Sequence, residues 1–156
     1  MNHRRAAALA LVTLCILPAC NRTPAAEKTE MHRDVPPHGG TPIALGDDYR
    51  LELVRYADTG TLSGYVLDDE MEEFIRSPSP AIELDVEAGG QRRVLVLAAV
   101  ANPATGETVG DSSLFQAQAD WLKTAGSFSA VLHGLTVRGT TFPDTPFPFP
   151  AGNDHE

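Results

Sequence analysis

The stretch Tyr49-Arg-Leu-Glu-Leu-Val-Arg-Tyr56, then Ala57-Asp-Thr-Gly60 and Thr61-Leu-Ser-Gly-Tyr-Val-Leu67, decides the fold class of this chain. Large apolar residues alternate with Arg50 and Glu52, which is the two-residue period of a strand with one buried face and one solvated face. The short connection ends in a glycine, a residue suited to the left-handed conformation that hairpin turns require. The stretch therefore predicts an antiparallel β-hairpin.

The same alternation recurs further along the chain. Ile82, Leu84 and Val86 alternate with acidic residues, so a second amphipathic strand is predicted there, with Gly89-Gly90 as the turn after it. The run that follows the turn, residues 92–100, is more uniformly apolar, and we expect it to be covered on both faces. Further strands are expected at residues 41–45, 128–131 and 135–142, and the proline-rich residues 142–150 suit a sheet edge.

Residues 112–123 fit two structures. Leu114, Phe115 and Trp121 could share one face of a helix, with Ser113 at its start in a capping box. A strand that runs into a single helical turn near Asp120 fits the same residues equally well. The sequence leaves both alternatives open.

Short strands separated by glycine and proline at regular intervals indicate an all-β fold. We expect a single antiparallel β-sandwich of about seven to nine short strands, with at most one short helical turn. It would occupy residues 38–150 and end in an acidic tail at 151–156. A flexible tether at 20–37 would precede it, because this part has little apolar content and no sustained period.

The first twenty residues have the three parts of a bacterial export signal. Arg4 and Arg5 precede an apolar run, residues 6–17, that is shorter than the roughly 20 residues a membrane-spanning helix needs. The run ends in Leu17-Pro-Ala-Cys20, which resembles the lipobox of bacterial lipoproteins. This resemblance implies that residues 1–19 are a signal peptide and that Cys20 receives lipid. Asn21, in place of the aspartate that often retains lipoproteins in the inner membrane, implies the outer membrane, facing the periplasm.

Composition excludes several classes of function. The formal net charge is −9, and loss of residues 1–19 would take it to −11, because Arg4 and Arg5 leave with no acidic residue. Such a balance argues against nucleic acid as a partner and against electrostatic adhesion to anionic lipid. Cys15 would leave with the signal and Cys20 would carry lipid, so no disulfide, thiol nucleophile or thiolate metal site is expected in the mature chain.

Histidines are the candidate metal ligands. Imidazole nitrogens suit copper, zinc and nickel, and carboxylates can complete such a site. We expect His38, at the start of the domain, to act with His32 of the tether or with His155 of the acidic tail. His133, beside a glycine, is more typical of a bend or of the edge of the core than of a ligand.

One part of the chain resembles known bacterial proteins. The residues are His38-Gly-Gly-Thr-Pro-Ile-Ala-Leu-Gly46, Tyr49-Arg-Leu-Glu-Leu-Val54, Gly60-Thr-Leu62 and Tyr65-Val-Leu-Asp68. Together they resemble small secreted β-domain proteins of uncharacterised function, and similar segments occur near the start of some periplasmic adaptors of heavy-metal efflux systems. In many such segments a Gly-His pair follows the second strand, where this chain has Asp69-Glu70. The resemblance therefore implies fold and compartment more than a metal site.

These observations predict a lipid-anchored binding or accessory module of the cell envelope, without enzymatic activity. In one interpretation it handles a transition metal or accompanies a metal-efflux system. In the other it is a structural or protein-interaction lipoprotein that offers a sheet edge, or its proline-rich end, to an envelope partner.

Overall fold

A computed structural model describes residues 35–153, and these form an all-β domain, as predicted. The proposed signal peptide, Cys20, His32 and His155 lie outside the described residues. The strands are β1 (Thr41–Leu45), β2 (Tyr49–Tyr56), β3 (Thr61–Asp68), β4 (Ala81–Ala88), β5 (Gln91–Ala99), β6 (Leu114–Gln118), β7 (Phe128–His133), β8 (Thr136–Val137), β9 (Thr140–Thr141) and β10 (Thr145–Phe149). A short 3-10 helix, η1 (Asp120–Lys123), is the only helical element in this part of the chain.

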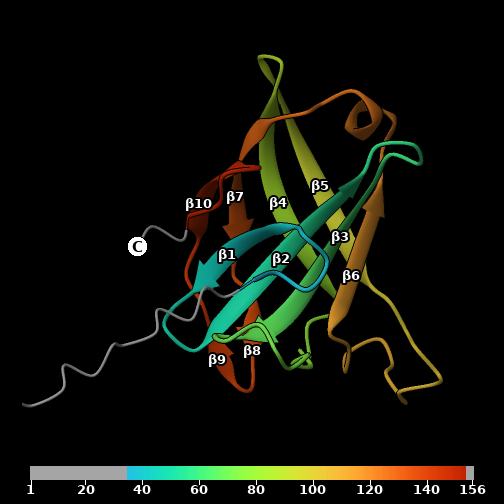
Figure 1. The fold of residues 1–156 in the computed structure, drawn as a ribbon, viewed down its shortest axis with the longest axis vertical. Helices are drawn as coiled ribbons and strands as arrows, with labels where there is room; N and C mark the ends of the chain where they lie inside the picture. The colour runs from blue at the N-terminus through green and yellow to red at the C-terminus, as the bar shows by residue number, and fades with distance from the viewer. Residues whose placement is uncertain (1–34, 154–156) are drawn as a thin grey trace, which may run out of the picture. The chain divides into compact units, whose positions relative to one another are not determined.

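Eight of the strands form one antiparallel sheet in the order β1-β2-β3-β6-β5-β4-β7-β10, and β8 pairs with β9 separately. The sheet curls until its two outer strands, β1 and β10, come to lie beside each other, so the domain resembles a barrel (Figure 1). The predicted antiparallel all-β architecture is confirmed. The proline-rich end is also at a sheet edge, as β10.

The two edges are joined by hydrogen bonds that involve side chains. The Thr41 hydroxyl donates to the carbonyl oxygen of Pro150 over 3.0 Å. The backbone N–H of Ala44 donates to Oδ1 of Asn153 over 2.8 Å. Residues just after β10 thus close the barrel against β1, although the two strands share no backbone ladder.

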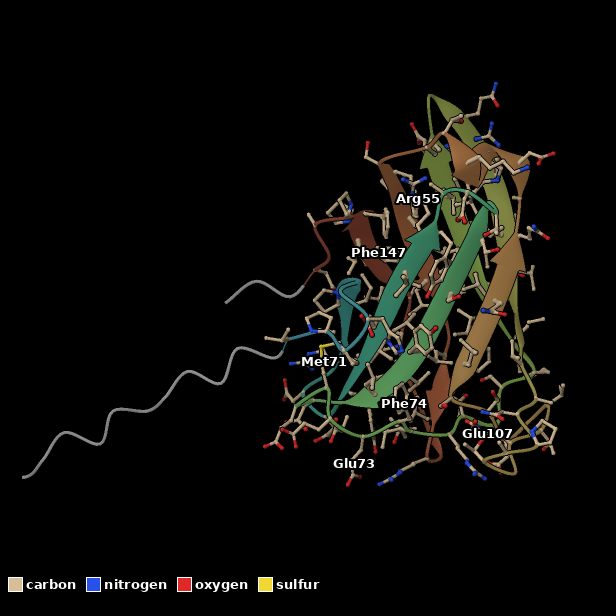
Figure 2. The ribbon with its side chains drawn as sticks, turned by 45° about the vertical axis from the view of Figure 1, so that its right-hand side comes forward. Arg55, Met71, Glu73, Phe74, Glu107 and Phe147 are labelled. Carbon is tan, nitrogen blue, oxygen red and sulfur yellow. The ribbon has the colours of Figure 1, made fainter. Side chains whose placement is uncertain are left out.

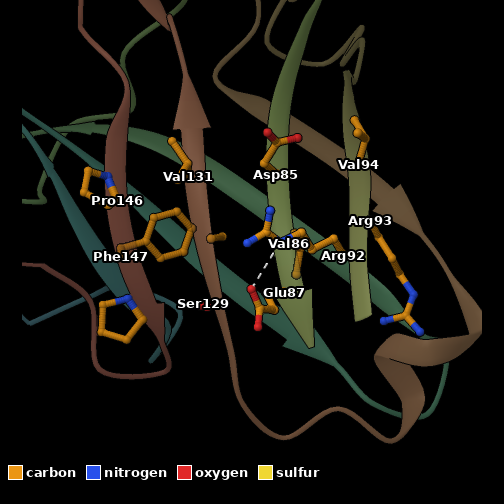
Figure 3. Close-up of a pocket in the computed structure, with 12 residues that line it drawn as sticks. Asp85, Val86, Glu87, Arg92, Arg93, Val94, Ser129, Val131, Pro146 and Phe147 are labelled. Atoms are coloured by element: carbon orange, nitrogen blue, oxygen red, sulfur yellow. Dashed lines mark hydrogen bonds and ion pairs between the residues drawn. The ribbon is translucent and has the colours of Figure 1, made fainter. Parts of the chain in front are cut away.

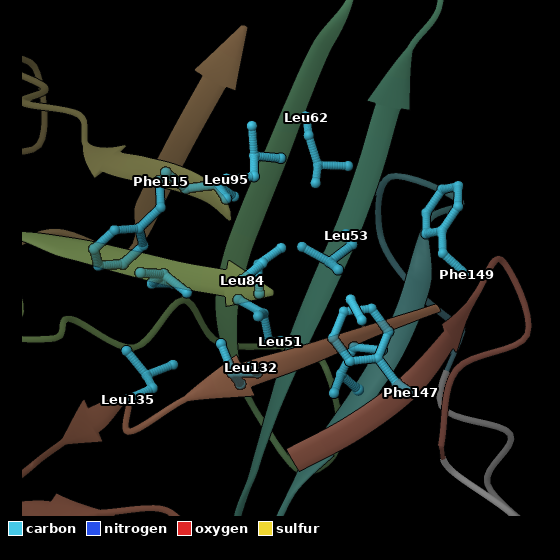
Figure 4. Close-up of a cluster of buried hydrophobic side chains, with 14 of the residues drawn as sticks. Leu51, Leu53, Leu62, Leu84, Leu95, Phe115, Leu132, Leu135, Phe147 and Phe149 are labelled. Carbon is cyan, nitrogen blue, oxygen red and sulfur yellow. The ribbon is translucent and has the colours of Figure 1, made fainter. Parts of the chain in front are cut away.

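The core fills the inside of the curled sheet with the inward-facing residues of each strand. In β4 the alternation is complete, with every second residue buried and those between them exposed or half-buried. Leucine and phenylalanine side chains from seven strands meet in the interior (Figure 4): Leu51, Leu53, Leu62, Leu84, Leu95, Phe115, Leu132 and Phe147. Trp121 of η1 packs edge-on against Phe128 at the periphery of this cluster.

Two predictions about individual strands are wrong. β5 is not covered on both faces, because Val94 and Val96 are 60% and 51% exposed. The single curled sheet has no second layer outside it, so the outer face of β5 meets solvent. Residues 135–142 do not form one strand but a small hairpin, in which β8 turns back into β9 through Arg138 and Gly139.

The ambiguous segment 112–123 is a strand followed by one helical turn. Phe115 of β6 pairs with Gly64 of β3, and η1 begins two residues after β6 ends. The helical alternative with a capping box at Ser113 is wrong, because pairing with β3 and β5 draws this segment into the sheet. The described residues contain no helix that is long and apolar enough to cross a membrane.

Candidate metal-binding site

Three ligand-type side chains converge on the outer face of β4 and β7. Glu83 and Asp85 lie two residues apart on β4, so both point outward, and His133 ends β7 directly opposite Glu83. Each of the three side chains offers one ligand atom, and these atoms lie within 4.8 Å of one another. We call these three residues the outer-face cluster.

The spacing within the outer-face cluster suits a small metal ion. Nε2 of His133 lies 3.2 Å from Oδ2 of Asp85. Two ligands held at about 2.0–2.1 Å from one tetrahedral zinc ion would be about 3.3 Å apart. The two side chains could therefore share an ion with little movement.

Asp144, immediately before β10, contacts the other ring nitrogen of the histidine. Its Oδ2 lies 3.1 Å from Nδ1 of His133. A carboxylate on one imidazole nitrogen fixes the tautomer and directs the lone pair of the other nitrogen to a metal. Asp144 thus stands where metal sites commonly hold a supporting carboxylate.

The same contacts change the protonation of His133. Hydrogen bonds to Asp144 and then to Asp85 raise the pKa of His133 above its ordinary value of 6.5. A proton held between two carboxylates competes directly with a metal cation for Nε2. Metal binding at this cluster must therefore depend on pH.

A shallow hollow of about 750 Å³ adjoins the cluster on β4, β5, β7 and β10 (Figure 3). Asp85 belongs to both the cluster and the hollow. Beside it, Val94, Val131 and Pro146 present apolar surface, while Glu87 forms an ion pair with Arg92 over 3.4 Å. The outer-face cluster is thus at the rim of a surface with room for a larger ligand.

His38, the one predicted metal ligand within the described residues, is hydrogen-bonded to the Glu52 carboxylate. Its backbone N–H donates to Oε1 of Glu52 over 2.9 Å, and its Nδ1 lies 2.8 Å from Oε2 of the same carboxylate. The ring stacks on Tyr65 with centroids 3.8 Å apart. His32 and His155, its predicted partners, are outside the described residues, so the set of three histidines stays a prediction.

The segment around His38 lies directly on β2 and covers Glu52. The N–H of Gly40 also donates to Oε1 of Glu52, over 2.8 Å, and the Glu52 side chain is completely buried. A Cβ atom at Gly40 would lie 2.7 Å from the carbonyl oxygen of Leu53. Glycine at this position therefore allows the close approach that buries the carboxylate.

A second buried carboxylate, that of Glu107, lies in the loop before β6. Burial raises the pKa of Glu107, but hydrogen bonds from Ser113 and Thr105 outweigh it and hold that pKa below its usual value. Figure 2 shows Glu107 and the half-exposed Phe74 at the same end of the domain, where both line a small pocket. These hydrogen bonds engage both oxygens of the carboxylate and stabilise the 102–113 loop.

Sequence reasoning missed the outer-face cluster. The alternation of β4 does indicate that Glu83 and Asp85 point to solvent, but it carries no information on which strand lies next to β4. The neighbour is β7, about fifty residues further along the chain. Only that pairing brings His133 to the two carboxylates.

Comparison of the chain with protein-family models, with curated proteins and with solved structures finds no match.

Proposed function

We propose that this protein is a lipid-anchored accessory module of the bacterial envelope that binds a divalent transition metal. The observation that carries the metal assignment is the outer-face cluster, in which one imidazole and two carboxylates from neighbouring strands converge. One nitrogen and several oxygen donors suit zinc, copper or nickel better than calcium, which takes six to eight oxygen ligands. The sequence-predicted set of His38 with His32 or His155 is a separate proposal, and one titration distinguishes the two.

Replacement of His133 by alanine should strongly weaken metal binding. We expect the full chain, purified in detergent, to bind zinc or copper with micromolar affinity by calorimetry, which corresponds to about −8 kcal/mol. The affinity of the His133→Ala variant for the metal should be at least about tenfold lower, because the remaining carboxylates are exposed and strongly hydrated.

Metal binding should also weaken below the raised pKa of His133 and strengthen as the pH rises through it, because Nε2 must release its proton before it can bind the metal.

The matched control is His38→Ala, which removes a histidine far from the outer-face cluster in sequence. Unchanged binding in that variant, with loss in His133→Ala, supports the proposal. Binding that survives His133→Ala and disappears in His38→Ala would instead assign the metal to the sequence-predicted set. Absence of binding in the parent chain at pH 8 would refute both assignments.

The anchor has its own test. The Cys20→Ser variant should leave the membrane fraction and retain its uncleaved signal, because no lipid can be attached to serine. A single acyl chain holds a protein only marginally, whereas several chains at ~0.8 kcal/mol per buried methylene form a durable anchor. Fractionation and mass measurement of the parent and the variant decide this. A variant that is processed normally and stays in the membrane would contradict the lipobox assignment.

A further inference from the structure

Part of β5 is an unpaired edge, although β5 lies in the middle of the eight-stranded sheet. β5 and β6 pair only at Ala98↔Gln116 and Ala99↔Phe115. Beyond these two pairs β6 pairs only with β3. The residue after β6, Ala119, also bonds to the β3 side, since its N–H donates to the carbonyl oxygen of Gly60 over 2.9 Å. Figure 1 shows the two strands separating toward the β4–β5 turn.

Hydrogen-bond directions identify the backbone groups that this separation leaves unpaired. The N–H of Ala99 donates to Pro80, on the β4 side, and the N–H of Val100 donates to Leu114, on the β6 side. Because successive residues of an antiparallel strand point their N–H and C=O groups to opposite sides, Arg92, Val94 and Val96 face away from β4. No described segment pairs with the backbone of these three residues, which we call the open edge of β5.

The open edge is less protected than the two outer edges of the sheet, because it contains no proline and Arg92 is its only charged residue. Prolines interrupt both outer strands of the sheet, with Pro42 in β1 and with Pro146 and Pro148 in β10. β5 contains neither proline nor lysine, and Val94 and Val96 are 60% and 51% exposed. Exposed apolar edges without such protection readily accept another strand.

We propose that the open edge of β5 pairs, antiparallel, with the open edge of a second copy of this chain, with Val94 on the two-fold axis. Such an interface is self-complementary, as a two-fold dimer requires. Arg92, Val94 and Val96 of each copy would exchange backbone hydrogen bonds with the other. The proposal is independent of the metal assignment, because the outer-face cluster lies on β4 and β7.

The side chains select this register. With Val94 opposite itself, Arg92 of one copy faces Val96 of the other. Val96 is in turn paired with Glu83 on β4 of that second copy, so the arginine has an acidic residue on the next strand but one. Centring on Arg92 would oppose two arginines, which is unfavourable across a strand pair. Centring on Val96 would place Val94 against Ala98, whose backbone already pairs with Gln116. A two-fold axis at Arg93 would again oppose two arginines, and one at Leu95 would place Arg92 against Ala98. Among these registers, only the one centred on Val94 opposes no like charges and keeps its three edge residues clear of occupied backbone.

Disulfide trapping in the full, membrane-anchored chain tests this register. In the proposed dimer the two Val94 Cα atoms would be about 5.5 Å apart, which is within the range for a disulfide. The Val94→Cys variant should therefore form a covalent dimer under mild oxidation, seen on a non-reducing gel. The parent chain provides the baseline, because its Cys15 would leave with the signal and its Cys20 would carry lipid.

Val96→Cys is the matched control, because it is an equally exposed valine two positions along the same strand. Its two copies would be about 13 Å apart along the strand direction, too far for a disulfide, so Val94→Cys should give at least about tenfold more dimer. The double variant Arg92→Cys/Val96→Cys should regain crosslinking, because these positions face each other. A monomeric Val94→Cys, equal crosslinking of the two single variants, or an uncrosslinked double variant would each overturn the proposal.

Discussion

Replacing Glu52 with alanine should lower the free energy of unfolding of the β domain by about 2–4 kcal/mol. The carboxylate is completely buried on the outside of β2, beneath the segment that leads into β1. It accepts hydrogen bonds from the backbone N–H groups of His38 and Gly40 and contacts the His38 ring. Alanine would remove the acceptor of both N–H groups and leave a void beneath the segment.

Such a loss is large for a domain of this size, since total stabilities are about 5–15 kcal/mol. Chemical denaturation followed by the fluorescence of Trp121, the single tryptophan, measures it. Glu87→Ala is the control, because Glu87 is an exposed strand glutamate whose ion pair with Arg92 is solvated, and it should change stability by less than about 0.5 kcal/mol. If the two variants unfolded at the same denaturant concentration, Glu52 would have no anchoring role.

Replacing Gly152 with alanine should destabilise the domain by about 2–4 kcal/mol through the contact that closes the barrel. A Cβ atom at this position would lie 2.3 Å from the carbonyl oxygen of Pro42 in β1. Gly152 also has φ +76°, in the left-handed region that disfavours alanine. Relief of the clash requires the residues after β10 to move away from β1, so the hydrogen bond between Ala44 and Asn153 should be lost as well.

Gly89→Ala is the control, because it introduces the same backbone strain as Gly152→Ala without a steric clash. Gly89 has φ +58° in the β4–β5 turn, and a Cβ atom there would meet nothing within 4 Å. This variant should cost only about 1 kcal/mol, the strain of the left-handed conformation. Denaturation of both variants gives the difference, and faster hydrogen exchange of the Ala44 amide in Gly152→Ala should accompany it. Equal effects of the two substitutions would show that the contact with Pro42 contributes nothing to closure.

Local patterns predicted most of the strands. Alternation in residues 49–56 and 82–86 and the glycines at 60 and 89–90 mark two of the hairpins in the structure, β2–β3 and β4–β5. These signals are legible because the side-chain period of a strand and the conformation of a tight turn depend on neighbouring residues only. The same reasoning fails at β5, whose apolar composition predicts burial on both faces. The outward-facing Val94 and Val96 are instead exposed beside an unpaired part of the strand.

By itself the sequence determined the all-β class, the strands of the main hairpins and the edge position of the proline-rich end, because each follows from residues close together in the chain. The tertiary structure alone decided which strands are neighbours. It placed His133 beside Glu83, buried Glu52 under His38, joined Ala44 to Asn153 and left β5 partly unpaired. Strand order depends on how the whole sheet closes around its core, and no local pattern encodes a contact between residues fifty or a hundred positions apart.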